Sequence, residues 1–175
     1  MRSILVLSAL TVLLAACGSQ PPAPEQNPSG VESRNPNAVT APVAKTADFD
    51  PMSIAALKDP RSPLSKRSVY FDYDSYVVKD EFKALLTAHA KFLAANPKMK
   101  MLIQGNADER GSREYNLALG QKRSDAVKKA LQLLGARDEQ LESVSLGEEK
   151  AVCSEQTETC WAQNRRGDML YSGEF

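Results

Sequence analysis

The stretch KMLIQGNADERGSREYNLALGQKRSDAVKKALQLLG, residues 100–135, contains the pattern of a strand, a loop and a long helix. The run Lys100–Gln104 predicts a strand. The residues that follow, 105–111, include two glycines, an asparagine and an aspartate, which predicts a loop. A helix is predicted from about Glu114 to Leu134, and it ends at Gly135, a residue well suited to the left-handed position that closes helices.

The helix in this stretch has a charged residue on its apolar face. Its apolar stripe consists of Leu119, Ala126, Val127, Ala130, Leu131 and Leu134, yet Arg123 lies four residues after Leu119, within the same stripe. Because an unpaired charge is costly to bury, we expect Arg123 to be partly buried and to have a polar partner.

The segments on either side of this stretch complete a small domain. Ser68–Phe71, Leu141–Leu146 and Met169–Tyr171 predict three further strands. Apolar residues from Phe82 to Leu93 recur at helical spacing, and Asn96-Pro97 ends that helix. The order βαβαββ predicts an α/β fold of the α+β type, a two-layer sandwich with the helices packed on one sheet.

Residues 1–16 have the features of an export signal. Arg2 supplies a positive start, and Ile4–Leu14 is an apolar run too short to span a bilayer. The end of the run resembles the lipobox of bacterial lipoproteins, which implies that Cys17 carries a diacylglyceryl group and an N-acyl chain. In such lipoproteins an aspartate after the cysteine favours the inner membrane, so Gly18 points to the outer membrane. An ordinary signal peptide followed by a chance cysteine is the alternative.

A proline-rich stretch separates this signal from the domain. The segment from Gly18 to about Lys66 holds nine of the ten prolines in the chain. Such a composition cannot bury enough apolar surface to fold, which predicts a disordered tether, with a short helical turn at Ile54–Leu57. We divide the chain into a signal peptide, 1–16, a lipidated N-terminus with a flexible linker, 17–57, and a folded domain, 58–175.

Two cysteines remain once Cys17 is lipidated. Cys153 and Cys160 form an even pair in an oxidising compartment, where a disulfide is the default outcome. A metal site is the alternative, but the sole histidine, His89, is distant in sequence and the spacing fits no standard zinc pattern. His89 lies in an apolar helix stripe, where we expect a hydrogen-bonded core side chain. Trp161 is expected to pack over the disulfide. The sequence predicts no metal and no other cofactor.

Several short motifs occur in an order that resembles one known family, the peptidoglycan-associated lipoproteins (Pal). The resemblance covers residues 68–171 and rests on Val69–Asp74, Ala88-His89-Ala90, Gly105–Gly111, Glu114-Tyr115-Asn116, Leu119–Arg123 and Asn164-Arg165-Arg166. It implies an OmpA-like domain with a mixed sheet, which binds the stem peptide of peptidoglycan non-covalently through meso-diaminopimelate. It also implies TolB and TolA as partners, and a role in envelope integrity and in outer-membrane constriction during division. Two departures from the family pattern are the segment 153–160 and Gly167-Asp168, which interrupts a usually more apolar strand start.

The resemblance also implies which residues bind the ligand. The two positions that grip it fall on Asp108 and Arg123, and four more line the same pocket: Tyr73, Asp74, Asn116 and Leu119. A diaminopimelate centre presents an ammonium and a carboxylate on one carbon, so its receptor needs an anion and a cation close together. The planar fork of an arginine suits the carboxylate because it donates two parallel hydrogen bonds. The alternative is a purely structural salt bridge between Asp108 and Arg123. Arg165-Arg166 is either a solvated pair, a fold contact or a part of the binding site.

Other classes of function find less support. The chain has 22 basic and 22 acidic side chains, so the basic surface of a nucleic-acid-binding protein is not expected. A peptidoglycan hydrolase would need paired carboxyls, a metal or an activated nucleophile. Asp108-Glu109 is the only adjacent acid pair in the predicted loop, and adjacency does not establish catalytic geometry. A flagellar-motor stator that shares the wall-binding domain would need a transmembrane helix, which no stretch of this sequence predicts.

Overall fold

The computed structural model describes residues 50–175. The predicted signal peptide, Cys17 and the linker as far as residue 49 lie outside the described residues. Within the described part, four strands form one mixed sheet in the order β1-β4-β2-β3, in which β2 and β3 run parallel and the other pairs antiparallel. The strands are β1 (Ser68–Tyr70), β2 (Met101–Asn106), β3 (Leu141–Gly147) and β4 (Arg166–Tyr171).

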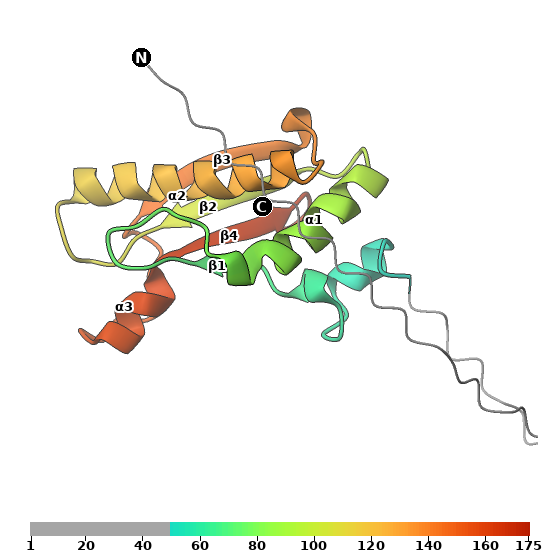
Figure 1. Cartoon of the computed structure of the whole chain (residues 1–175). Coiled ribbons are helices and arrows are strands. Elements are labelled where there is room, and N and C mark those ends of the chain that lie inside the picture. The colour runs from blue at the N-terminus through green and yellow to red at the C-terminus, as the bar shows by residue number, and fades with distance from the viewer. Residues whose placement is uncertain (1–49) are drawn as a thin grey trace, which may run out of the picture. The chain divides into compact units, whose positions relative to one another are not determined.

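Two long helices cover one face of this sheet (Figure 1). They are α1 (Lys83–Ala95) and α2 (Arg113–Leu133), and a shorter helix, α3 (Glu158–Asn164), lies near one end of the sheet. Four single turns of 3-10 helix complete the domain: η1 (Ile54–Leu57), η2 (Pro63–Ser65), η3 (Asp80–Phe82) and η4 (Asp138–Gln140). The two-layer α+β arrangement predicted from the sequence is therefore confirmed.

The hydrophobic core lies between the sheet and the two long helices. Leu86 and Phe92 of α1 and Val127 and Leu131 of α2 are almost fully buried against Ile103 and Met169 of the sheet, among other residues of one contiguous cluster. Burying such side chains contributes roughly 1.5 to 3 kcal/mol each relative to full exposure. The domain is therefore held mainly by this single core.

Helix α2 ends as its sequence predicts. The backbone N–H of Gly135 donates to Gln132 O, and that of Ala136 donates to Leu131 O. Gly135 itself has a φ of 105°, which side-chain-bearing residues rarely adopt. The glycine therefore terminates the helix.

The predicted order βαβαββ lacks one helix, and its last strand begins earlier in the structure than predicted. Helix α3, between β3 and β4, was not predicted. Strand β4 begins at Arg166, three residues before the predicted start at Met169. Gly167 does not interrupt the strand, since it pairs with Val69 on one side and with Gly105 on the other. Pairing on both sides overrides the weak strand propensity of glycine and aspartate.

The start of the packed domain also differs from the predicted boundary at residue 58. The predicted turn at Ile54–Leu57 is present as η1, and two of its residues, Ala56 and Leu57, are buried in the core cluster. The packed part of the chain thus reaches into the last residues of the segment predicted as linker.

His89 is a core residue, as predicted. Its side chain is fully buried, with Nε2 2.9 Å from the carbonyl oxygen of Lys66 and Nδ1 2.8 Å from the hydroxyl of Tyr171. Because a carbonyl only accepts, Nε2 carries the proton and Nδ1 accepts from the tyrosine. Burial lowers the pKa of His89 to about 4, so the ring is neutral at physiological pH.

Candidate functional site

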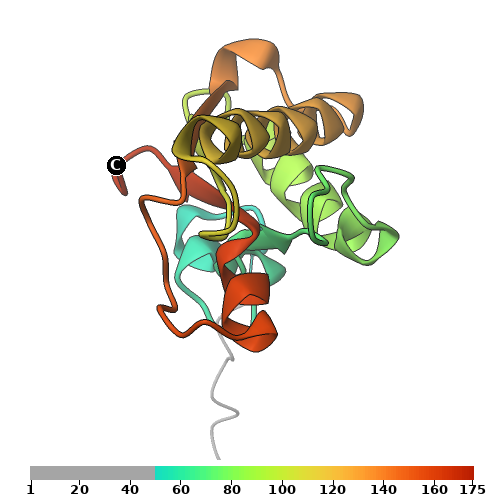
Figure 2. The same ribbon diagram turned by 90° about the vertical axis from the view of Figure 1, so that its left-hand side faces the viewer.

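A cavity of about 210 Å³ lies at the end of the sheet where β2 leads into α2. Three segments form its walls: the loop after β1, the loop after β2 and the first turns of α2. Figure 2 faces the end of the domain at which these segments meet. All six residues that the sequence predicted for the pocket line it, together with three that it did not: Tyr73, Asp74, Asp108, Asn116, Leu119 and Arg123, with Arg110, Gly111 and Tyr115.

Arg123 reaches this cavity from the buried face of α2, which two glycines hold close to the sheet. A Cβ on Gly105 of β2 would lie 1.8 Å from the carbonyl oxygen of Gly120. This close approach is possible only because position 105 lacks a side chain. Arg123, one turn after Gly120, is thereby placed beneath the loops that surround the cavity.

The guanidinium of Arg123 donates to three backbone carbonyls. Nε donates to Ser75 O at 2.8 Å, Nη1 to Asn106 O at 2.9 Å and Nη2 to Asp72 O at 3.2 Å. Its side chain is completely buried, and burial lowers its pKa to about 10, which still leaves it protonated at neutral pH. Arg123 therefore joins the loop after β1 to the end of β2 and places a positive charge at the cavity.

Asp108 also lines the cavity, is almost fully buried and accepts hydrogen bonds from two arginines. Its Oδ2 lies 2.7 Å from Nη2 of Arg110 and 3.1 Å from Nη1 of Arg165, and Oδ1 accepts from the backbone N–H of Arg110 at 3.1 Å. Burial raises the pKa of Asp108, but the hydrogen bonds from Arg110 and Arg165 more than offset this, so the pKa lies below its usual value. Asp108 is thus a carboxylate at neutral pH.

The structural salt bridge considered for Asp108 and Arg123 is not formed. Within residues 50–175, Asp108 makes its ion pairs with Arg110 and Arg165, while Arg123 is satisfied by carbonyls. The two predicted ligand-gripping residues therefore line one cavity without neutralising each other.

The remaining predicted residues also line the cavity. Asp74, at a positive φ of 50°, accepts a hydrogen bond from the hydroxyl of Tyr115, and this bond raises the pKa of Tyr115. Tyr73 is exposed, and its ring lies 4.2 Å from the guanidinium carbon of Arg110. Asn116 is buried, and its Nδ2 donates to Glu148.

The three residues that sequence reasoning missed lie inside motifs it had identified. Arg110 and Gly111 belong to the loop after β2, and Tyr115 precedes Asn116 in the first turn of α2. Gly111 has a φ of 116°, so the loop needs a glycine there. A basic residue two positions after Asp108 was the available signal for Arg110, because a side chain at that distance can fold back onto the carboxylate.

Arg165 and Arg166 are both fold contacts. Arg165 is buried, with Nε donating to Phe71 O, Nη1 to Asp108 and Nη2 to Glu158. Arg166 donates to Asp168 and to the carbonyl oxygen of Lys150. Arg165 alone of the two supports a cavity residue directly.

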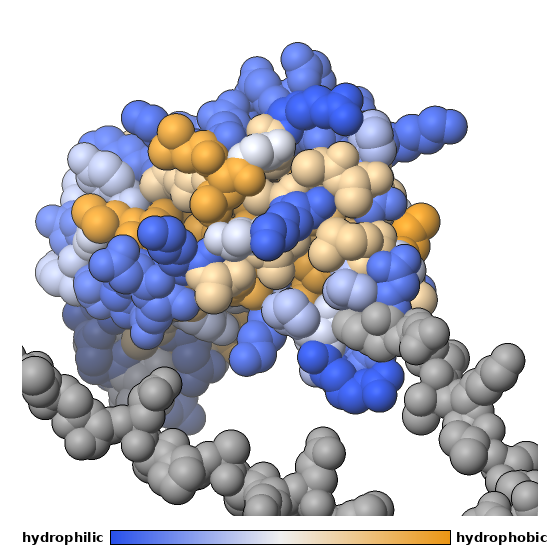
Figure 3. Space-filling model, turned by 45° about the vertical axis from the view of Figure 1, so that its right-hand side comes forward, coloured by the Kyte–Doolittle hydropathy of each residue, from blue (hydrophilic) through white to orange (hydrophobic). Residues whose placement is uncertain are grey.

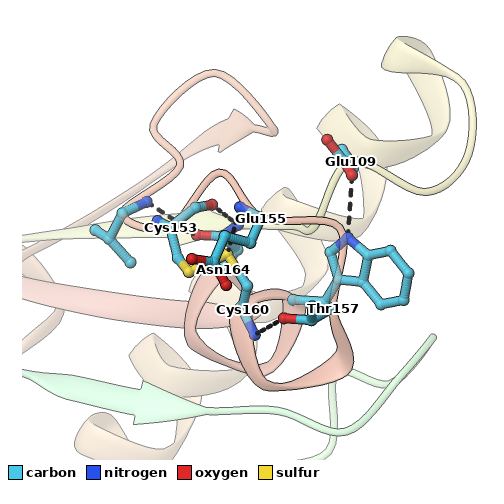
Figure 4. Close-up of a disulfide and its surroundings, with 8 residues drawn as sticks. Glu109, Cys153, Glu155, Thr157, Cys160 and Asn164 are labelled. Carbon is cyan, nitrogen blue, oxygen red and sulfur yellow. Dashed lines mark hydrogen bonds between the residues drawn. A yellow bond between two sulfur atoms is a disulfide. The ribbon is translucent and has the colours of Figure 1, made fainter.

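The predicted disulfide between Cys153 and Cys160 is present, with the Cα atoms 5.2 Å apart (Figure 4). The side chain of Asn164 further holds this segment, since it donates to Cys153 O and accepts from the backbone N–H of Val152 and Cys153. Trp161 was expected to pack over the disulfide. Instead its indole N–H donates to Glu109 in the loop after β2, and its ring contacts Arg110.

A second, larger cavity of about 770 Å³ lies between β1 and α1. It is lined by Tyr70, Phe82, Leu85, Ala84 and Ala88 together with a few polar residues. Figure 3 shows the apolar side chains gathered on this face among charged ones. None of the predicted site residues lines this cavity.

Residues 50–175 contain no cluster of three or more histidine, cysteine or carboxylate side chains suited to hold a metal ion. Among their helices, none combines the length and the apolar character that a membrane crossing requires.

The chain is similar to known proteins both in sequence and in fold. Residues 70–165 match the model of the OmpA family. The peptidoglycan-associated lipoprotein of Pasteurella multocida is 45% identical over 104 residues, which cover 59% of this chain and 69% of that protein. That of Haemophilus influenzae is also 45% identical over 104 residues, covering 59% of this chain and 68% of its own length. The crystal structure of the peptidoglycan-associated lipoprotein from Burkholderia pseudomallei is 60% identical, with a TM-score of 0.66, and the match covers 67% of this chain and 99% of that one.

The chain belongs to the peptidoglycan-associated lipoproteins of the OmpA family. These lipoproteins are structural proteins of the cell envelope, and the chain is accordingly not an enzyme. The C-terminal domain of Helicobacter pylori MotB, at 19% identity and a TM-score of 0.57, shares the fold alone.

Proposed function

We propose that this peptidoglycan-associated lipoprotein binds peptidoglycan non-covalently, by seating the diaminopimelate of a stem peptide in the cavity between Asp108 and Arg123. The observation that carries the proposal is the presence of a buried carboxylate and a buried guanidinium on one cavity, unpaired with each other. A zwitterionic ligand can pair with both groups at once, through its ammonium and its carboxylate. The names of the relatives support the same class of ligand.

The ligand's two charged groups have separate receptors in this arrangement. The ammonium faces the carboxylates of Asp108 and Asp74, both of which line the cavity. The carboxylate faces Arg110 and Arg123. Arg123 uses three of its five N–H groups on carbonyls, which leaves two for a ligand. Charge-assisted hydrogen bonds of this kind are the stronger ones in proteins.

We further propose how the protein is anchored and located in the cell envelope. A diacylglyceryl and N-acyl anchor on Cys17 would hold the protein in the outer membrane, with the linker spanning the distance to the wall and the domain in the periplasm. Such a protein would tie the outer membrane to the wall. We infer that it acts in the Tol-Pal system with TolB and TolA as partners. Its role there would be to support envelope integrity and outer-membrane constriction at division. The lipobox-like sequence and the proline-rich linker support the anchor and the tether, and the family of the chain supports the role in the Tol-Pal system.

Wall binding is tested by sedimentation with purified peptidoglycan, with a soluble stem peptide ending in meso-diaminopimelate as competitor. Asp108→Asn keeps the shape of the side chain but removes its charge, and losing one partner of a desolvated charge pair costs about 2 to 5 kcal/mol. Binding should weaken roughly 30-fold or more. Asp138→Asn is the matched control, because Asp138 pairs with Lys128 away from the cavity. If folded Asp108→Asn binds walls as well as Asp138→Asn does, the proposed site is wrong.

The anchor is tested by labelling cells with radioactive palmitate. Wild-type protein should incorporate the label and fractionate with the outer membrane. Cys17→Ser should be exported without lipid and be released with the periplasm, because the lipid is the proposed anchor. Incorporation of palmitate into Cys17→Ser would contradict this part of the proposal.

A further inference from the structure

Arg110 is held in place by groups from three separate parts of the chain. Its Nη2 pairs with Asp108 at 2.7 Å and its Nη1 with Glu158 at 3.3 Å. Its guanidinium carbon lies 4.2 Å from the ring centroid of Tyr73 and 4.2 Å from that of Trp161. Its side chain is nevertheless 29% exposed and lines the cavity.

Trp161 is itself fixed in two ways. The backbone N–H of Trp161 donates to Thr157 O within the first turn of α3, and the indole N–H donates to Glu109 at 3.1 Å. The preceding residue, Cys160, is bonded to Cys153, which ties the helix to the loop before it (Figure 4). The ring is therefore presented to Arg110 from a braced element.

We propose that Trp161 is a positioning residue of the binding site, which orders the guanidinium of Arg110 at the cavity before a ligand arrives. This inference rests on the proposed function, since it names a residue that acts on the same site. Trp161 does not itself line the cavity and acts through Arg110.

The physical basis is preorganisation. An arginine side chain has several rotatable bonds, and immobilising such a side chain on binding costs about 0.5 to 1.5 kcal/mol, a cost that is avoided when the side chain is already ordered. A guanidinium over an indole ring gains attraction from the ring's electron density, and tryptophan gives the strongest such contact among the aromatic residues. Trp161 should therefore improve affinity without contacting the ligand.

The experiment compares Trp161→Leu, Trp161→Phe and wild type in calorimetric titrations with a stem tripeptide ending in meso-diaminopimelate. Trp161→Leu removes the ring under Arg110 and should bind about three- to tenfold more weakly. Trp161→Phe keeps a ring and should recover most of the affinity. Tyr70→Leu is the matched control, because Tyr70 is a partly exposed aromatic whose ring faces Phe82 and not this cavity.

Rescue by Trp161→Phe is the readout that a merely structural role would not give, because the smaller ring restores a stacking surface for Arg110 but does not restore the hydrogen bond to Glu109. Should Trp161→Leu fail to fold by circular dichroism, Trp161→Met replaces it in the same comparison, because methionine also removes the ring and keeps an apolar side chain.

The titrations distinguish a failure of the positioning role of Trp161 from a failure of the proposed binding function. If wild type does not bind the tripeptide, the proposed function fails and the positioning role falls with it. If wild type binds but the variant without the ring binds as tightly as Tyr70→Leu, or Trp161→Phe binds no better than that variant, the positioning role alone is overturned.

Discussion

Gly105 of β2 and Gly120 of α2 touch through their backbones, and a Cβ on Gly105 would lie 1.8 Å from the carbonyl oxygen of Gly120. Helix α2 carries Asn116, Leu119 and Arg123 to the cavity, so this contact sets how close these side chains come to the loops. The packing of one glycine pair therefore links the fold to the site.

Gly105→Ala should destabilise the domain by about 1 to 3 kcal/mol or more, because the added methyl group meets backbone atoms that cannot move independently of α2. Urea unfolding followed by circular dichroism measures the loss. The same variant should bind peptidoglycan more weakly while folded, since α2 must shift outward with Arg123. An unchanged unfolding midpoint would show that the helix does not approach the sheet as closely as described.

Arg123→Lys tests whether the fork of the guanidinium matters beyond its charge. A lysine ammonium cannot reach three carbonyls from one position, so the variant leaves at least one buried carbonyl without its donor, at about 1 to 3 kcal/mol per group. Both the free energy of unfolding and wall binding should fall. Lys129→Arg, the reverse exchange at an exposed position on the same helix, should change stability by no more than about 0.5 kcal/mol. Equal stability of the two variants would refute the role of Arg123 in joining the loops.

Stability should depend on pH through His89. The folded-state pKa is about 4 and the unfolded value about 6.5, so between these values the unfolded chain binds a proton that the folded domain does not. The stabilisation from the neutral ring is complete above about pH 6.5 and is lost as the pH falls toward 4, by up to about 3 kcal/mol. His89→Gln, which has no titrating ring, should lose less stability over this window. Unfolding titrations at several pH values measure the difference, and parallel curves for the two proteins would contradict the assignment.

The sequence predicted those elements whose signals are local. The apolar stripe and terminal glycine of α2 identify that helix because helical periodicity extends over its whole length. The two-layer order of strands and helices followed from the same patterns. The six pocket residues came from the family resemblance, and the structure brings all of them to one cavity.

The features that sequence reasoning missed depend on contacts between distant segments. Helix α3 has seven residues and too short an apolar pattern to detect, and it is held by the Thr157 cap and the disulfide. The start of β4 at Arg166 depends on pairing with β1 and β2. The contact of Trp161 with Arg110 joins helix α3 to the loop after β2, two segments that no local pattern relates, which is why Trp161 was expected over the disulfide instead.

The disulfide should stabilise the domain modestly. Chain-entropy scaling gives about 2 to 3 kcal/mol for the short loop that Cys153 and Cys160 close. Asn164 holds the same loop by three hydrogen bonds, so the double variant Cys153→Ser, Cys160→Ser should fold and lose no more than this amount. Urea unfolding of the double variant and of wild type, with and without reductant, measures the difference, and reductant should affect wild type only. Thiol alkylation of protein taken from the periplasm without reductant supplies the chemical check. Labelling of both cysteines there would show that the bond does not form in the cell, and a stability loss well above about 3 kcal/mol would show that Asn164 cannot hold the loop alone.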